Sequence, residues 1–253
     1  MKIATWNVNS IRSRLEYVKM FLKDNDIDIS GIQELKTEEK NFPFDDFKAL
    51  GYNVEALGQK AYNGVALISR FPFYKVIKNV LDENEARTIL GVVNEITILN
   101  IYFPHGGEYG SERFFYKLEF YKKIKNYILK NNLLAENFIL MGDFNVAKEE
   151  IDVWDPMLLS GTIGFMEEER EALSDLISIG LIDAFRYFHK YVQEFTWWDY
   201  TGGSFRRNWG MRIDYILVSE KLLPKLKNCY IEKTFRKCEK PSDHVPVVLE
   251  VQI

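Results

Sequence analysis

The chain has 253 residues, 47% of them hydrophobic, and carries 33 basic against 37 acidic side chains, for a net charge of −4. This composition excludes a wholly disordered chain, and its weakly acidic balance does not by itself indicate a nucleic-acid-binding protein. No apolar run reaches the roughly 18 to 20 residues of a membrane span and no secretory signal is present, so we expect a cytoplasmic protein without a membrane partner.

The predicted elements alternate between strands and helices. The first part of the chain has a β-α-β pattern, with a strand over residues 2–8, an amphipathic helix over 12–23 and a strand over 27–33. Short runs with a two-residue period then predict antiparallel hairpins. These runs cover residues 52–56, 64–69, 74–80, 88–93 and 95–103.

A longer helix is predicted over residues 112–130. Its apolar stripe contains Phe115, Leu118, Tyr121, Ile124 and Ile128. The remaining predicted elements are a strand over 138–141, a helix over 167–179 and strands near 195–198, 213–219, 228–233 and 245–252. Because no linker or repeat divides the chain, we expect a single domain over residues 1–253. So many strands favour an α/β fold with two packed, mostly antiparallel sheets.

Polar side chains stand at the ends of five predicted strands. They are Asn7 with Asn9, Glu34, Asp143 with Asn145, Asp214, and Asp243 with His244. Each has an ordinary alternative, such as a turn residue or a pairing of Glu34 with Lys36. Their recurrence, without a phosphate-binding loop or a nucleophile motif, favours oxygen ligands for a hard cation such as Mg²⁺.

Such a site suits hydrolysis of a phosphodiester. The reaction needs a positive centre, a base for water and neutral donors near the developing charge. Glu34 can hold the metal, Asp143 can take the proton of water, and Asn7 and Asn145 can donate hydrogen bonds.

Two further groups complete this hypothesis. His244 needs an orienting partner, and Asp214 is the candidate because an acid on one ring nitrogen fixes the tautomer of the imidazole. Tyr102, which follows the run Ile98–Ile101 near the end of the predicted strand 95–103, can contribute a phenolic hydroxyl.

Eight short segments, spread over nearly the whole chain, occur in the order of one known family. They are residues 6–12, 31–36, 62–66, 100–104, 142–147, 164–170, 210–215 and 241–244. By these segments the chain resembles exodeoxyribonuclease III and the related apurinic/apyrimidinic (AP) endonucleases of the endonuclease/exonuclease/phosphatase superfamily. The resemblance implies a four-layered α/β sandwich, with two sheets packed face to face and helices outside.

The resemblance also implies an activity. We expect a Mg²⁺-dependent DNA-repair phosphodiesterase that incises duplex DNA 5′ to abasic sites, leaves a 3′-hydroxyl, and has 3′-to-5′ exonuclease or 3′-end-trimming activity. Mn²⁺ is an alternative ion, and one-metal and two-metal schemes both stay open. The partner is double-stranded DNA with abasic or blocked 3′ ends, and the protein is expected to be a monomer.

The resemblance assigns site residues by matching position. The metal ligands are Asn7, Glu34, Asp143, Asn145, Asp243 and His244, with Asn9 beside them. The catalytic groups are Tyr102, Asp143, Asn145, Asp214 and His244. The pocket for a flipped abasic sugar is formed by Trp197, Met211 and Ile213. The DNA-binding residues are Arg12, Lys60, Tyr62, Arg206 and Arg207.

Charge is unevenly distributed along the chain, which leaves room for a basic surface. Residues 186–240 carry twelve basic and six acidic side chains, whereas residues 143–175 carry two basic and ten acidic ones. The plain alternative is that these runs are solvated helix faces.

Three positions depart from the family pattern. Met211 stands where some relatives carry Trp and makes a softer pocket wall. His105 is either a phosphate donor or an exposed loop residue, and Trp209 replaces a frequent Arg.

Two other functions are alternatives to the repair nuclease: a DNA-damage binding module with a vestigial site, and a nonspecific endonuclease resembling deoxyribonuclease I.

Overall fold

The computed structural model describes residues 1–252, in which the strands form two six-stranded sheets and one two-stranded sheet. The first sheet has the order β13 (Leu226–Ile231), β14 (Val247–Val251), β1 (Lys2–Asn7), β2 (Ile29–Gln33), β4 (Val65–Ser69), β3 (Asn53–Leu57). The second has the order β5 (Lys75–Lys78), β6 (Thr88–Val93), β7 (Ile96–Tyr102), β8 (Asn137–Asp143), β12 (Asp214–Ser219), β9 (Leu181–Asp183).

Each large sheet contains one parallel pair of strands among antiparallel neighbours. The parallel pairs are β1 with β2 and β7 with β8. Their registers place Asn7 opposite Gln33 and Tyr102 opposite Asp143. Parallel strands end at the same edge of a sheet, so each pair brings polar chain ends together. The prediction of mostly antiparallel sheets is confirmed.

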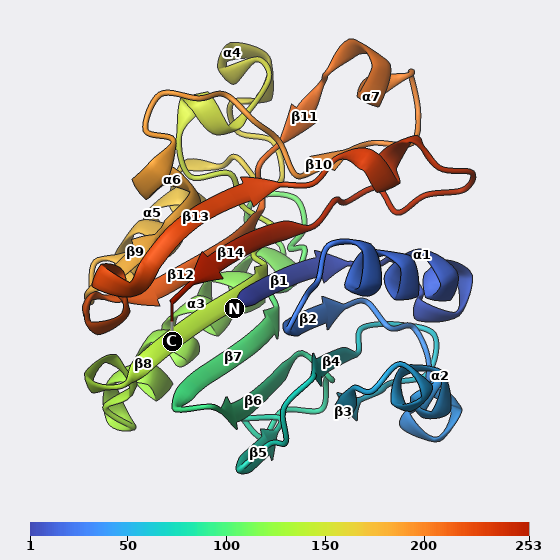
Figure 1. Cartoon of the computed structure of the whole chain (residues 1–253). Coiled ribbons are helices and arrows are strands. Elements are labelled where there is room, and N and C mark those ends of the chain that lie inside the picture. The colour runs from blue at the N-terminus through green and yellow to red at the C-terminus, as the bar shows by residue number, and fades with distance from the viewer. Residues whose placement is uncertain (253) are drawn as a thin grey trace.

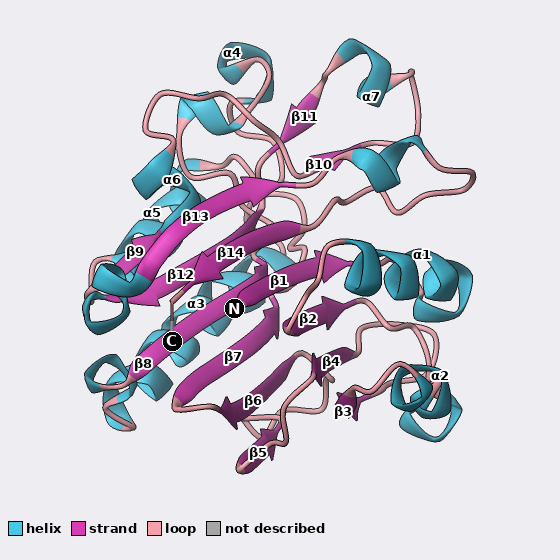
Figure 2. Cartoon of the chain, in the orientation of Figure 1, coloured by secondary structure: helices cyan, strands magenta, loops and turns pink. Residues whose placement is uncertain are grey.

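The two sheets pack face to face, and helices cover their outer faces (Figure 1, Figure 2). Side chains alternate along a strand, so Ile3 of β1 faces the second sheet while Ala4 packs on the other side. That outer side is covered by α1 (Ile11–Asp24) and α2 (Phe44–Ala49), and the second sheet is covered by α3 (Glu112–Lys130) and α5 (Glu167–Ile177). The predicted four-layered sandwich is therefore confirmed.

The predicted buried stripe of α3 was wrong at two positions, Phe115 and Leu118, and Leu118 is only half-buried. Phe115 is 59% exposed, and the buried positions are Phe114, Lys117, Phe120, Tyr121, Ile124 and Ile128. The helix period of 3.6 residues joins positions 114, 117, 121, 124 and 128 on one face. Because Lys117 lies on that face, a pattern of hydrophobic side chains alone does not identify which positions are buried.

Short elements lie in the connections between β8, β9 and β12 of the second sheet. Strands β10 (Trp197–Trp198) and β11 (Gly210–Met211) form the two-stranded sheet. The helices are α4 (Pro156–Leu159), α6 (Ala184–Phe188) and α7 (Ser204–Arg207). In the described part of the chain, no helix is both long enough and apolar enough to cross a membrane.

Candidate active site

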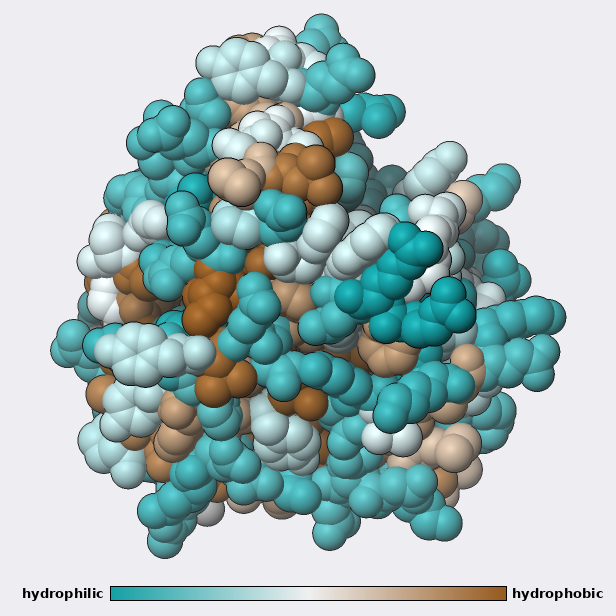
Figure 3. Space-filling model, turned by 90° about the horizontal axis from the view of Figure 1, so that it is seen from above, coloured by the Kyte–Doolittle hydropathy of each residue, from teal (hydrophilic) through white to brown (hydrophobic). Residues whose placement is uncertain are grey.

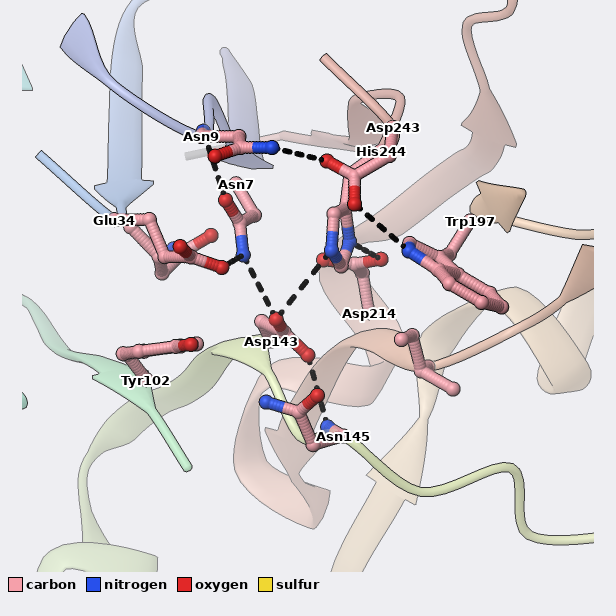
Figure 4. Close-up of polar contacts among 12 residues, drawn as sticks. Asn7, Asn9, Glu34, Tyr102, Asp143, Asn145, Trp197, Asp214, Asp243 and His244 are labelled. Atoms are coloured by element: carbon pink, nitrogen blue, oxygen red, sulfur yellow. Dashed lines mark hydrogen bonds and ion pairs between the residues drawn. The ribbon is translucent and has the colours of Figure 1, made fainter. Parts of the chain in front are cut away.

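Polar side chains from both sheets meet where the parallel strand pairs end (Figure 4). Asn7 ends β1 and Glu34 follows β2, while Tyr102 ends β7 and Asp143 ends β8. Glu34 has a positive φ of 53°, so the chain turns sharply at the end of β2. The predicted convergence of strand ends is present in the structure.

Asn7 bridges the two carboxylates. Its Nδ2 donates to Glu34 Oε1 and to Asp143 Oδ2, each at 2.8 Å, and its Oδ1 accepts from the backbone N of Asn9 at 3.0 Å. The amide nitrogen of Asn7 therefore faces the carboxylates and its oxygen is already engaged. This arrangement fits the hydrogen-bond donor inferred from the sequence, and the assignment of Asn7 as a metal ligand stays a prediction.

Asp143, His244 and Asp214 form a buried line of ionisable groups. His244 Nδ1 lies 2.9 Å from Asp214 Oδ2, and its Nε2 lies 3.7 Å from Asp143 Oδ2. Burial alone would lower the pKa of His244, but the charges of Asp214 and Asp143 raise it to about 10. The imidazole is therefore positively charged at neutral pH.

The carboxyl group of Asp143 is also perturbed. Burial raises the pKa of Asp143 to about 7; the positive charge of His244 opposes this shift and the negative charge of Asp214 adds to it. Its Oδ1 accepts from the backbone N of Asn145 at 2.8 Å, which fixes the carboxylate toward the following turn. A carboxylate with this pKa can accept a proton near neutral pH.

Asn145 and Tyr102 stand on the side formed by the second sheet. Asn145 Nδ2 donates to the carbonyl of Phe103 at 2.9 Å, and Asn145 also has a positive φ. The Tyr102 ring lies under the guanidinium of Arg87, 4.9 Å from its centroid. Burial, followed by the charges of Glu34 and Asp143, holds the pKa of Tyr102 well above its ordinary value. Its phenol is therefore a neutral donor.

Asp243 links the site to the pocket wall. Its Oδ1 accepts from Asn9 Nδ2 and its Oδ2 accepts from Trp197 Nε1, both at 3.0 Å. Burial opposes ionisation of Asp243, but the charge of His244 and these two hydrogen bonds lower its pKa. Asp243 is therefore an anion that also orients the Trp197 ring.

The donor set fits a hard divalent cation. One ligand atom each from Glu34, Asp143 and His244 can lie within 4.8 Å of one another. Lys36 Nζ lies 2.8 Å from Glu34 Oε2 and 2.5 Å from Asn9 Oδ1. Oxygen atoms from two chain segments therefore already contact one positive charge, the ammonium group of Lys36. Carboxylate and amide oxygens are the ligands that Mg²⁺ prefers. The pairing of Glu34 with Lys36, the ordinary alternative for Glu34, is thus also present.

A cavity of about 210 Å³ opens beside these groups. The three residues predicted for an abasic pocket, Trp197, Met211 and Ile213, all line it. Gly164 completes the apolar wall with a φ of +85°, and a Cβ there would lie 3.2 Å from the carbonyl of Asn145. His105 is an exposed loop residue that also lines the cavity, and partial desolvation and the charge of Lys117 lower its pKa.

The five residues predicted to bind DNA lie outside this cavity and are all exposed: Arg12, Lys60, Tyr62, Arg206 and Arg207. The face that carries α4, α7, β10 and β11 is largely hydrophilic, with small hydrophobic areas between the polar side chains (Figure 3). Trp209 stacks on Trp154 at 5.0 Å, with the guanidinium of Arg207 4.5 Å from its ring.

Several residues that shape the site were not singled out from the sequence. Lys117 donates to the carbonyl of Asn145 and to Glu169, and Ile163 and Gly164 line the cavity. The hydroxyl of Tyr200 accepts from Asn9 Nδ2 at 3.1 Å. A signal for Lys117 existed, because it lies four residues before Tyr121 on the apolar face of α3. A lysine at such a position needs a buried partner.

Comparison with known proteins gives a consistent result. The chain matches the model of the endonuclease/exonuclease/phosphatase family over residues 4–244. It is 32% identical to exodeoxyribonuclease III of Haemophilus influenzae, over 99% of both chains. A structure of an AP endonuclease from Archaeoglobus fulgidus superposes with a TM-score of 0.96 at 37% identity, covering both chains fully. A structure of a 3′ phosphatase of Neisseria bound to a product DNA hairpin superposes with a TM-score of 0.96 at 35% identity, again covering both chains fully.

Proposed function

This chain belongs to the endonuclease/exonuclease/phosphatase family as an exodeoxyribonuclease III-like AP endonuclease, and we propose that it is a Mg²⁺-dependent phosphodiesterase that incises duplex DNA 5′ to abasic sites. Incision leaves a 3′-hydroxyl, and the same site removes nucleotides or blocking groups from 3′ ends. The supporting observation is the meeting of Glu34, Asp143 and His244 at one edge of the packed sheets, beside a cavity with an apolar wall.

A divalent cation in this site would supply positive charge to the phosphate oxygens and to the leaving alkoxide. Glu34 would hold it, with Asn7, Asp243 and Asn9 around it. Asp143, Asn145 and His244 are the candidates for a second position, which His244 would ligate only as a neutral imidazole. One-ion and two-ion schemes both fit this donor set, and Mn²⁺ is expected to substitute for Mg²⁺ because it accepts the same oxygen ligands.

The residues of the chain have separate roles in the proposed reaction. Asp143 accepts the proton of the attacking water, for which a pKa of about 7 is suitable. In the one-ion scheme, the hydrogen bond to Asp214 keeps His244 an imidazolium, which faces the phosphate with positive charge. Asn145 and Tyr102 are neutral donors for the negative charge that develops on the phosphate oxygens.

We assign the selectivity for abasic sites over undamaged nucleotides to the cavity. Its volume of about 210 Å³ and its wall of Trp197, Met211 and Ile213 suit a sugar without a base, and extrusion of such a nucleotide costs less than extrusion of a paired one. The DNA on either side would be held by Arg12, Lys60, Tyr62, Arg206 and Arg207 through its phosphates.

The deciding experiment uses two duplexes that differ at one position. One carries a central tetrahydrofuran abasic analogue and the other is undamaged, and each is incubated with Mg²⁺ or with EDTA. We expect a Mg²⁺-dependent cut 5′ to the analogue, with a 3′-hydroxyl at the new end. Absence of any metal-dependent cut would contradict the proposed chemistry, and equal cutting of both duplexes would contradict the selectivity and favour a nonspecific endonuclease.

We also infer that residues 1–253 act as one domain and as a monomer. No residue of a second copy is needed to complete the site, since all the proposed groups come from one chain. Sedimentation equilibrium of the active protein tests the monomer, and a single cooperative unfolding transition tests the single domain.

A further inference from the structure

A buried ion pair lies behind the cavity and is not part of the proposed chemistry. Lys117 of α3 and Glu169 of α5 are both 0% exposed, and Lys117 Nζ lies 2.5 Å from Glu169 Oε1. Lys117 Nζ also donates to the carbonyl of Asn145 at 2.8 Å and to the carbonyl of His105 at 3.1 Å. An ammonium group has three N–H donors, so every donor of Lys117 has a partner.

The second oxygen of Glu169 reaches a third loop. Glu169 Oε2 accepts from the backbone N of Gly164 at 2.7 Å and from that of Met166 at 3.1 Å. Gly164 is part of the cavity wall, and its carbonyl accepts from the backbone N of Ala147 at 2.8 Å. The ion pair therefore ties together the loops that carry His105, Asn145 and Gly164, which all line the cavity.

The loop after His105 also rests on the lysine itself. Gly106 has a φ of +84°, and a Cβ at this position would lie 2.9 Å from Lys117 Cδ. The chain thus passes directly over the aliphatic stem of Lys117, close enough that only glycine fits. The backbone at Gly106 and the side chain of Lys117 are therefore in close contact behind the cavity.

Packing of α3 against α5 does not require this pair. The two helices already share an apolar core that includes Phe120, Ile124, Leu173 and Leu176. Replacement of a buried ion pair by apolar side chains is often neutral or stabilising, because the charges must be desolvated. The particular contribution of Lys117 and Glu169 is that they satisfy backbone groups of three loops that face the cavity.

We propose that Lys117 and Glu169 are positioning residues, which hold Asn145 and the Gly164 wall in the geometry that the reaction needs. They contact neither DNA nor metal and act through the loops that they fix. This inference rests on the proposed function, because the geometry that is held is that of the proposed phosphate donor and pocket wall.

The test compares Lys117→Met with the double variant Lys117→Met, Glu169→Gln. The single variant leaves a buried carboxylate unpaired and should lower the melting temperature, whereas the double variant removes both charges and should recover it. In both variants the carbonyls of Asn145 and His105 lose their donor. We therefore expect kcat on the abasic duplex to fall roughly 10- to 100-fold in both, with a smaller change in KM.

Ile128→Ala is the matched stability control. Ile128 is buried on the same helix, about three turns from Lys117, and lies outside the three loops. This variant should lower the melting temperature and leave kcat unchanged at temperatures where it is folded. If kcat recovers with the melting temperature in the double variant, the pair is structural only and the inference is overturned.

Amide hydrogen exchange gives a readout that does not need activity. In the double variant the amides of Gly164, Met166 and Ala147 should exchange faster than in the wild type, while those of β8 keep their protection. Unchanged exchange at these amides would contradict the inference even if the enzyme were inactive. An inactive wild type with the expected exchange pattern would instead count against the proposed function alone.

Discussion

Glu34 and Asp143 are both carboxylates of one site, but their surroundings differ. Glu34 is partly exposed and pairs with Lys36, whereas Asp143 is buried between Asn7, Asn145 and His244. We predict that Glu34→Gln is partly rescued by higher Mg²⁺, because it weakens ion binding. Asp143→Asn should lose roughly 10²- to 10⁴-fold in kcat without rescue, because it removes a base.

A titration of kcat against Mg²⁺ concentration separates these two variants. Glu16→Gln is the control, since Glu16 is an exposed carboxylate on α1 whose partner is Lys19. Equal rescue of the Glu34 and Asp143 variants by Mg²⁺ would show that the division of roles is wrong.

His244 provides a prediction about pH. Because its pKa is raised to about 10 in the folded protein, the imidazolium persists above neutral pH and is lost as the pH rises through that value. If activity requires the imidazolium, the wild type should lose kcat/KM on this alkaline limb. Asp214→Asn removes the negative charge that favours the protonated form, so the limb should move to lower pH. A profile of kcat/KM against pH checks this, and an unmoved limb would count against the role of Asp214.

The sequence predicted which residues meet at the site better than how they meet. Strand ends in two parallel pairs placed Asn7, Glu34 and Asp143 together, and these elements have clear periods. The direction of the Asn7 amide depends on the backbone N of Asn9, which no pattern of residue types encodes. The position of Lys36 between Glu34 and Asn9 likewise depends on two turns with positive φ.

At the scale of elements, a second buried charge network fixes the segment between β11 and β12, next to the pocket wall. Asp152 accepts from Arg212 Nε at 2.8 Å and from Arg186, and Arg212 also pairs with Asp183. Arg212 lies between Met211 and Ile213 of the cavity wall. We predict that Asp152→Ala lowers the free energy of unfolding by about 3–5 kcal/mol, because it removes the buried carboxylate shared by Arg186 and Arg212 and leaves only Asp183 to balance Arg212.

Urea denaturation of the two proteins measures this difference. Asp175→Ala is the control, since Asp175 pairs with Lys125 at 2.6 Å on the surface and its loss should change stability little. If both variants lost a similar free energy of unfolding, the buried Asp152 network would contribute no more to stability than a surface ion pair.

Long elements were predictable and short ones were not. The helix over residues 112–130 and the strands β6 and β7 match their predicted ranges to within one residue, because each spans several periods of its pattern. The three residues of β9 and the four of α7 show no period of their own. β9 exists because it pairs with β12, which is a contact between distant parts of the chain.

At the scale of the whole molecule, the sheet order explains why residues far apart in sequence can form one site. β1 lies between β14 and β2, so Asn7 comes close both to Glu34 and to the segment before β14 that carries Asp243 and His244. The convergence of these residues was predicted from the family resemblance, which rests on eight segments that occur in the family's order. The apolar periods alone predicted two packed sheets but not which strands are neighbours.

The overall charge of −4 also leads to a prediction at this scale. A net acidic protein that binds DNA must rely on a local set of basic side chains, so binding should weaken steeply with salt. Removal of Arg206 and Arg207, both exposed on α7, should reduce the slope of log K against log salt by about 2, since each phosphate contact contributes roughly 0.9.

The matched control removes two exposed basic residues from the opposite end of the sheets. Lys221→Ser, Lys227→Ser makes the same change in net charge, and Lys221 lies against Ala135, just before β8 begins and thus far from Asp143 where it ends. Fluorescence anisotropy of an abasic duplex at several salt concentrations, with EDTA to prevent cleavage, measures both slopes. Equal reduction in the two variants would mean that overall charge governs binding, and that α7 is not part of the DNA-binding surface.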